Sequence, residues 1–213
     1  MNFIGLRQCN FLANLNGRWH LPDATLWNKS QKQMSKKVIA IIGATEKLGS
    51  VFSKNLAKFK YRLLLFSHDE AKLNSLEKEI KAATPKADIE CMNCPMDASW
   101  EADIVITDIH DKKELIEKTK PFANRKIVLS VFYASEEKEL EKLLAGARLV
   151  KIFIARRAIN FLNAENEEQI ELVLDSEDEE AIDTATKIVK EAGFDPVLLK
   201  TFLLRKESLV RFF

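Results

Sequence analysis

The sequence predicts an α/β fold: a mainly parallel sheet with helices on both faces. Two observations carry this prediction. Short apolar runs alternate with amphipathic segments of helical length along most of the chain, and the first run, residues 38–42, is apolar throughout, as in parallel strands buried on both faces. Strands that alternate with helices form right-handed crossover units, and successive units build a parallel sheet.

The expected elements follow one another from residue 36 onward. Strands are expected at residues 38–42, 62–66, 87–92, 103–107, 126–131, 149–154, 169–174 and 196–200. Helices are expected at residues 48–59, 69–84, 112–120, 136–144 and 178–192. Gly193 follows the last helix at the C′ position, where glycine commonly ends helices.

Length and composition predict one globular domain with a short extension. The chain of 213 residues is 46% hydrophobic and has a net charge of +1, which argues against nucleic acid as the main partner. Residues 1–35 show no period of strand or helix, so we predict a peripheral or disordered extension; a natural start at Met34 and a functional arm are the two interpretations. Residues 36–213 form the predicted domain, with 148–213 as a small C-terminal continuation of the sheet.

The N-terminal and cysteine patterns predict a cytoplasmic protein without a membrane partner. Polar residues interrupt the N-terminal apolar run that a signal peptide needs, and no segment reaches the ~20 apolar residues of a membrane span. Three cysteines cannot all pair within one chain, which suits a reducing compartment. Cys91 and Cys94 have the spacing of a redox or metal pair, but no second pair lies nearby, so we expect no metal site.

The turn after the first strand carries the strongest functional signal. Gly43 and Gly49 are two of only six glycines in the chain; the first permits a tight turn, and the last lets the helix pack closely on the sheet. The N–H groups at the helix start and the positive end of its dipole favour an anion such as the pyrophosphate of a dinucleotide. These features predict a Rossmann-type, doubly wound fold. The predicted cofactor-binding residues of the turn are Gly43, Ala44, Thr45, Glu46, Lys47, Leu48 and Gly49.

Glu46 opposes the prediction of a bound dinucleotide. Dinucleotide-binding turns usually have a middle glycine at this point, which lets the backbone approach the phosphates. A glutamate adds bulk and a negative charge where the ligand is negative. The alternative is a Rossmann protein that keeps its packing glycines and binds no nucleotide.

The end of the second strand is expected to select between NAD and NADP. A carboxylate at this position accepts hydrogen bonds from the ribose of NAD and repels the additional phosphate of NADP. In this chain Ser67 and His68 come first, and the first acid is Asp69. A serine can donate to a phosphate and a histidine can add positive charge, so the sequence favours NADP. The same residues could instead serve only to cap the helix that starts near Asp69.

One candidate catalytic residue lies further along the chain. His110 follows the fourth strand, at the carboxyl edge where ligands of open α/β sheets bind. It could contact a nicotinamide or act as an acid, or it could be a surface histidine. The pair Arg156 and Arg157 could likewise reach a phosphate or lie exposed in a loop. The catalytic residues are otherwise unknown.

With these motifs, the chain resembles the deazaflavin-dependent NADP reductases and related predicted dinucleotide-binding oxidoreductases. The resemblance covers residues 37–213 and rests on the segments 39–45, 48–49, 101–105 and 126–130. It implies an NADP-binding Rossmann domain with a small C-terminal part that shapes a second pocket. The implied reaction is hydride transfer between NADP(H) and an unidentified acceptor, a small molecule such as a deazaflavin or another flavin-like compound.

The resemblance also assigns residues to the cofactor. It matches Gly43, Thr45, Leu48 and Gly49 to the phosphate turn and Ser67 to the ribose-phosphate position. In this chain Glu46 replaces a glycine of the family, and His68 replaces an arginine. The leading interpretation is an NADP-binding oxidoreductase, with a homodimer compatible with the sequence. The rival is a non-catalytic Rossmann protein that acts as a nucleotide sensor or a protein-interaction module.

Overall fold

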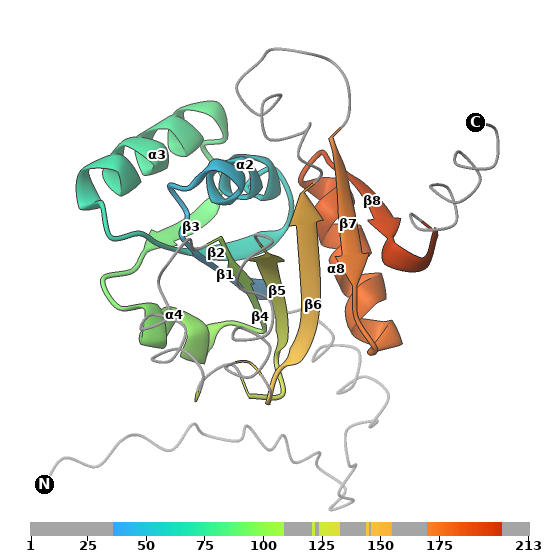
Figure 1. The fold of residues 1–213 in the computed structure, drawn as a ribbon. Helices are drawn as coiled ribbons and strands as arrows, with labels where there is room; N and C mark the ends of the chain where they lie inside the picture. The colour runs from blue at the N-terminus through green and yellow to red at the C-terminus, as the bar shows by residue number, and fades with distance from the viewer. Residues whose placement is uncertain are drawn as a thin grey trace, which may run out of the picture. The chain divides into compact units, whose positions relative to one another are not determined.

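The computed structural model describes residues 36–108, 121, 124–132, 144, 146–154 and 170–201. Eight strands of these residues form one sheet (Figure 1). The strands are β1 (Lys37–Ile42), β2 (Tyr61–Phe66), β3 (Asp88–Cys91), β4 (Ile104–Thr107), β5 (Ile127–Phe132), β6 (Arg148–Ile154), β7 (Glu171–Asp175) and β8 (Asp195–Leu198). The helices with described bounds are α2 (Lys47–Leu56), α3 (Glu70–Ala83), α4 (Pro95–Glu101) and α8 (Glu179–Glu191).

The strand order is β3-β2-β1-β4-β5-β6-β7-β8. The six strands from β3 to β6 are parallel, β7 is antiparallel to β6, and β8 is parallel to β7. The chain winds outward from β1 to β3 and then returns to place β4 on the other side of β1. This confirms the predicted doubly wound, mainly parallel sheet and places the topological switch point between β1 and β4.

The core lies on both faces of the sheet. Alternate residues of β1 point to opposite faces, and all of Ile39, Ala40, Ile41 and Ile42 are fully buried. Ile39 and Ile41 belong to an apolar cluster with α2, α3 and α8, whereas Ala40 and Ile42 belong to a second cluster with α4. Helices therefore cover both faces, as the apolar run of residues 38–42 predicts.

Helix α4 is the element that the sequence did not predict. It has seven residues, too few for an amphipathic period to show. Pro95 stands in its first turn, where a missing N–H costs nothing. At its other end, Lys126 Nζ donates to the carbonyl oxygens of Ser99 and Trp100 at 2.7 and 2.6 Å. Lys126, which directly precedes β5, thus caps α4, and the sequence near α4 gives no sign of this contact.

Other predicted bounds differ little from the structure or lie outside the described residues. The strand predicted at 196–200 begins at Asp195 and ends at Leu198. Gly193 follows α8 with φ of 89°, as predicted for a C′ glycine. The helices predicted at 112–120 and 136–144 and the extension 1–35 lie outside the described residues.

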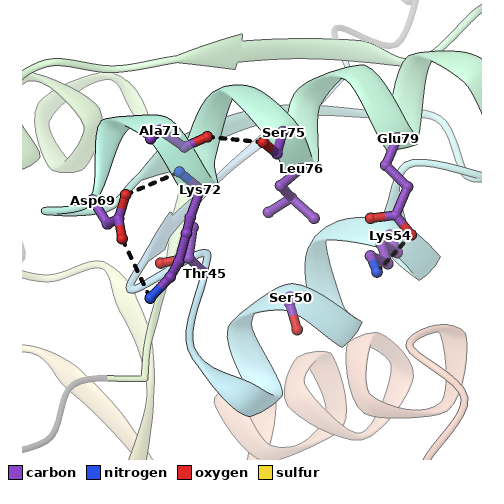
Figure 2. Close-up of a pocket in the computed structure, with 9 residues that line it drawn as sticks. All are labelled: Thr45, Ser50, Lys54, Asp69, Ala71, Lys72, Ser75, Leu76 and Glu79. Carbon is purple, nitrogen blue, oxygen red and sulfur yellow. Dashed lines mark hydrogen bonds and ion pairs between the residues drawn. The ribbon is translucent and has the colours of Figure 1, made fainter.

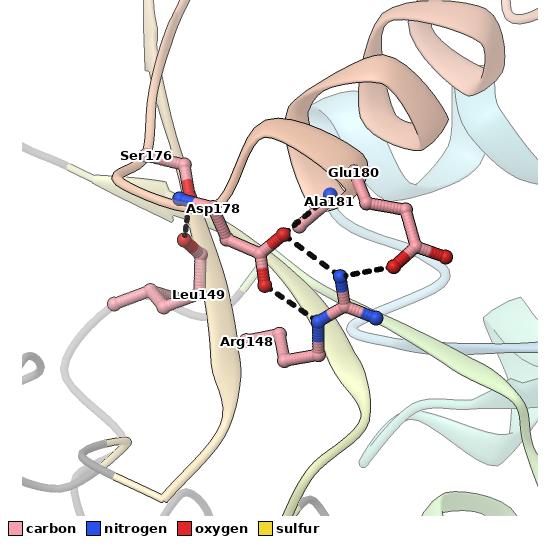
Figure 3. A network of polar contacts seen from close by, with 6 residues as sticks. All are labelled: Arg148, Leu149, Ser176, Asp178, Glu180 and Ala181. Atoms are coloured by element: carbon pink, nitrogen blue, oxygen red, sulfur yellow. Dashed lines mark hydrogen bonds and ion pairs between the residues drawn. The ribbon is translucent and has the colours of Figure 1, made fainter.

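A polar network joins the start of β6 to the start of α8 (Figure 3). Arg148 Nε and one terminal nitrogen bond the two carboxylate oxygens of Asp178 at 2.6 and 2.7 Å, a bidentate geometry that favours arginine. Asp178 also accepts from the N–H of Ala181 at 2.9 Å and so caps α8. One carboxylate therefore holds the helix end and the strand end together.

We expect this network to make stability depend on acid pH. The guanidinium of Arg148 and then the N–H of Ala181 lower the pKa of Asp178 to about 2 in the folded protein, against ~3.9 for an unpaired aspartate. The pair stabilises the fold fully above pH ~4, and this contribution disappears as the pH falls toward 2, because the unfolded chain takes up the proton first. Urea unfolding of the wild type and of Asp178→Asn should show a stability difference that shrinks between pH of about 5.5 and about 3. Asparagine is also a good N-cap, so a difference that stays constant with pH would contradict this role of the ion pair.

Candidate functional site

The turn between β1 and α2 is held against the ends of β2 and β4. Gly43 has φ of 88°, a conformation that side chains other than that of glycine rarely allow. The N–H groups of Gly43 and Ala44 both donate to the carbonyl oxygen of Phe66 at 2.9 Å. A Cβ at Gly43 would lie 2.1 Å from the carbonyl oxygen of Asp108. The predicted need for a glycine in this tight turn is confirmed.

Gly49 allows α2 to pass directly over the start of the turn. A Cβ at this position would lie 2.1 Å from the carbonyl oxygen of Gly43 and 3.2 Å from Cα of Ala44. Both contacts are with backbone, which cannot rotate aside as a side chain can. Gly49 was predicted to let the helix pack closely on the sheet, and the contacts that require glycine are with the turn directly after β1.

Glu46 is the N-cap residue of α2. Its φ of −73° and ψ of 170° are open to any residue, so its backbone conformation does not require glycine. Its N–H donates to the carbonyl oxygen of Gly43 at 2.9 Å, and its side chain makes no capping hydrogen bond. If Glu46 weakens the binding of a phosphate, the cause is therefore the size and charge of its side chain.

Asp108 contributes a buried carboxylate to the start of α2. It directly follows β4 and is fully buried, and one of its oxygens, Oδ2, accepts from the N–H groups of Leu48 and Gly49 at 2.9 Å each. The expectation that the helix presents these N–H groups to a ligand is wrong for these two residues. In the described part of the chain, the N–H groups of Thr45 and Lys47 have no protein acceptor.

Asp108 was not among the residues predicted from the sequence. The available signal was an acid at the end of a buried strand, at the carboxyl edge of a parallel sheet. Its partners lie about sixty positions earlier in the chain, so local patterns do not reveal the contact.

Ser67 joins the end of β2 to the turn. Its hydroxyl lies 2.5 Å from that of Thr45 and accepts from the N–H of Asp69 at 3.3 Å. Asp69 in turn caps α3 by accepting from the N–H of Lys72 at 2.9 Å. Ser67 therefore lies against the predicted phosphate turn and supports the start of the next helix, and its role toward a ribose phosphate stays a prediction.

An open cavity of about 410 Å³ lies between α2 and α3, beside the turn (Figure 2). Thr45 and Lys72 line one end, where Lys72 Nζ lies 3.3 Å from Asp69 Oδ2. Lys54 lines the other end and pairs with Glu79 at 2.8 Å. Lys72 was also missed by the sequence prediction; a lysine one turn into the helix after Ser67 was its only signal.

His68 lines a different cavity. This second cavity has a volume of about 220 Å³ at the carboxyl ends of β2 and β3. Its lining residues include Ser67, His68, Cys91, Met92 and Asn93. The ring of His68 meets that of Phe66 edge to face, with centroids 5.4 Å apart. Of the two predicted residues at the end of β2, only Ser67 bonds to the turn in the described structure.

Cys91 has the properties of a structural residue. Cys91 lies in β3, as predicted, and burial, followed by the nearby carboxylate of Glu77, raises its pKa to about 11. Such a thiol is protonated at neutral pH and is a poor nucleophile.

Within the described residues, no three side chains of His, Cys, Asp or Glu gather as a metal site, and no helix there has the length and apolarity to cross a membrane. His110, Arg156 and Arg157 lie outside the described residues.

Comparison with solved structures identifies the fold. An imine reductase from Myxococcus stipitatus in complex with NAD+ superposes with a TM-score of 0.59 at 13% identity, over 84% of this chain and 63% of that chain. The chain has a Rossmann fold. An F420-dependent NADP reductase from Arthrobacter gives 0.57 at 13% identity, over 78% and 85%. A hypothetical protein from Sinorhizobium meliloti gives 0.55 at 18% identity, over 80% and 88%.

These likenesses are structural. No protein-family model and no curated protein matches the sequence. The chain spans less than two thirds of the length of the imine reductase. The two structures described as reductases share their fold with this chain at 13% identity, and the hypothetical protein shares it at 18%.

Proposed function

We propose that this protein binds NADP(H) at the switch point between β1 and β4 and acts as an oxidoreductase. The single observation that carries the proposal is the turn after β1, which has Gly43 at a positive φ and the close-packed Gly49 at the carboxyl edge of a doubly wound sheet. Ligands of such sheets bind in the crevice at this point. The fold neighbours include proteins described with NAD+ and as an NADP reductase.

The residues fit the adenosine end of NADP better than its centre. Thr45 and Lys72 offer a hydroxyl group and an ammonium group at one end of the cavity, and the hydroxyl of Ser67 lies 2.5 Å from that of Thr45. These groups suit a phosphate monoester on the ribose. The free N–H groups of Thr45 and Lys47 are left for the pyrophosphate. Asp108 and Glu46 oppose the pyrophosphate, because both carry negative charge at the turn.

The bound cofactor would supply hydride chemistry, and the protein would orient it. The proposed acceptor is a small molecule, deazaflavin or flavin-like, held over the carboxyl edge of the sheet, with His110 as the candidate acid. A cytoplasmic protein, as a monomer or homodimer, suits this role. The residues at the adenosine end determine which cofactor binds, and they are the part of the proposal that substitutions can test directly.

We expect NADPH to bind more tightly than NADH, and Lys72→Ala to reduce the margin. Lys72 would pair with the ribose phosphate that NADH lacks, and its side chain is exposed, so the loss for NADPH should be about three- to tenfold. NADH affinity should stay unchanged. Isothermal titration calorimetry with both cofactors measures this, and Lys54→Ala is the matched control, because Lys54 lines the far end of the same cavity.

Three results would count against this assignment. Equal affinities for NADPH and NADH in the wild type would remove the cofactor preference. An equal loss of affinity in Lys72→Ala and Lys54→Ala would show a general effect of charge at the cavity. A loss of affinity for both cofactors in Lys72→Ala would place Lys72 elsewhere in the site.

A second function is favoured by one observation. The carboxylate of Asp108 accepts from two N–H groups of α2, which leaves fewer backbone donors for a pyrophosphate, and a Rossmann protein that serves as an interaction module needs none. A thermal-shift titration separates the two functions, because a ligand at 100 times its Kd adds ~2.7 kcal/mol of stability. A shift with NADPH supports the oxidoreductase, and no shift with either cofactor at millimolar concentration supports the non-catalytic role.

A further inference from the structure

We infer that Asp108 is a specificity-determining residue that competes with the pyrophosphate of the ligand for the start of α2. The inference rests on the proposed function and concerns the same site. The carboxylate of Asp108 accepts from the N–H groups of Leu48 and Gly49. A dinucleotide whose pyrophosphate binds at the start of α2 must displace this carboxylate. A nucleotide that lacks a pyrophosphate does not compete with Asp108 for these N–H groups.

The first step in the argument is the chemistry of the contact. Oδ2 of Asp108 accepts two N–H groups of the first turn of α2, each at 2.9 Å. These N–H groups and the positive end of the helix dipole are the features that bind phosphates at helix starts. A carboxylate oxygen accepts the same donors as a phosphate oxygen does. Asp108 therefore accepts the hydrogen bonds that these two N–H groups would otherwise donate to a phosphate of the ligand.

The second step is the fixed position of Asp108. Its N–H donates to the carbonyl oxygen of Ile42 at 2.9 Å, and its own carbonyl oxygen lies where a Cβ of Gly43 would be. The backbone of Asp108 is thus locked to the end of β1 and to the turn, and the residue has no exposed surface. The side chain cannot reach water without movement of the turn, so a pyrophosphate meets an anion that is already in place.

The third step is the local balance of charge. Glu46 is the N-cap of α2 and carries a second carboxylate on the same turn. Lys47, the next residue, is exposed, so solvent screens its charge more than that of the buried Asp108. The ammonium of Lys72 pairs with Asp69, beside the cavity that would take the adenosine end. Two acidic side chains, those of Glu46 and Asp108, therefore lie at the turn that would receive the centre of the ligand.

The experiment compares two nucleotides in two variants of the full chain. Asp108→Asn keeps a side-chain oxygen as acceptor and nearly the same volume, but removes the charge. Calorimetry with NADPH should show binding at least about tenfold tighter than in the wild type, and adenosine 2′-monophosphate, which has no pyrophosphate, should bind within about twofold of the wild type. Asp103→Asn is the matched control: it removes an acid that accepts a backbone N–H at the other end of β4, and neither affinity should change.

The outcomes separate the inference from the proposed function. If the wild type binds NADPH and Asp108→Asn binds it equally or more weakly, the inference is overturned and the proposed function stands. If neither ligand binds the wild type or the variant at millimolar concentration, the proposed function falls, and the inference with it. A selective gain for NADPH alone supports both.

A second measurement needs no variant, in case Asp108→Asn does not fold. Amide NMR signals of Leu48 and Gly49 in the wild type should shift on saturation with NADPH, because their acceptor changes from carboxylate to phosphate or is lost. Adenosine 2′-monophosphate should leave both signals in place. NADPH that binds without moving either amide signal would overturn the competition, and a wild type that binds no NADPH at millimolar concentration would overturn the inference.

Discussion

Gly49→Ala should destabilise the domain by about 3 kcal/mol or more, because the added methyl group has no room. Its Cβ would lie 2.1 Å from the carbonyl oxygen of Gly43 and 3.2 Å from Cα of Ala44. Leu48, beside it in α2, is fully buried, so the helix cannot lift without opening the core. For a domain of this size the loss corresponds to a melting temperature lower by roughly 6–12 °C. Urea unfolding and a thermal melt measure it.

Gly146→Ala is the control for this prediction. A Cβ at Gly146 would meet only the side chain of Asn124, with Oδ1 at 2.9 Å. An exposed side chain can rotate away, so the stability should change by no more than ~0.5 kcal/mol. If the two alanine variants unfold at the same urea concentration, α2 does not pack on the turn as closely as these distances require.

The sequence predicted the centre of the sheet well because its signals there are local. Residues 38–42 are apolar without interruption, and four of them are fully buried between two layers of helices. The glycines at 43 and 49 stand within one strand-turn-helix unit, so their spacing alone indicates a turn and a closely packed helix. Strand, turn and helix agree with one another, which is the condition under which sequence patterns are most informative.

The antiparallel strand β7 and helix α4 are features that local sequence patterns do not predict. The direction of β7 depends on its pairing with β6, in which Lys151 lies opposite Asp175, and the sequence of a single strand does not encode its direction. Helix α4 is capped by Lys126 from β5's start, a contact made only in the folded chain. Both features follow from long-range contacts.

The sequence predicted the backbone turn of the candidate site but not the charged side chains that lie beside it. The turn itself was found, and so was Ser67, because both follow strands directly. Asp108 and Lys72 were missed because each acts on residues brought close by the fold. His68 was predicted to act with Ser67, and both line the second cavity, but only Ser67 contacts Thr45 of the turn. Position after a strand does not decide which side chain reaches the turn, because neighbouring side chains point in different directions.

Glu46→Gly is expected to tighten NADPH binding by at least about tenfold. Two charges ~4 Å apart at an effective dielectric of ~20 interact by roughly 4 kcal/mol, and a tenfold gain needs only ~1.4 kcal/mol of it. The φ of Glu46 is −73° and its side chain makes no capping bond, and glycine is an accepted N-cap residue, so the fold should tolerate the change. Calorimetry with NADPH measures the gain.

Glu46→Gln separates charge from size, because glutamine keeps the shape of the side chain and removes its charge. A gain in both variants shows that charge opposes the ligand, as Coulomb repulsion between Glu46 and a pyrophosphate requires. A gain in Glu46→Gly alone assigns the cost to bulk over the backbone N–H groups of Thr45 and Lys47. If neither variant binds NADPH at millimolar concentration, the turn has lost its ligand for a reason that Glu46 does not explain. The oxidoreductase proposal then falls, and the buried carboxylate of Asp108 is the permanent occupant of the α2 start in a non-catalytic Rossmann protein.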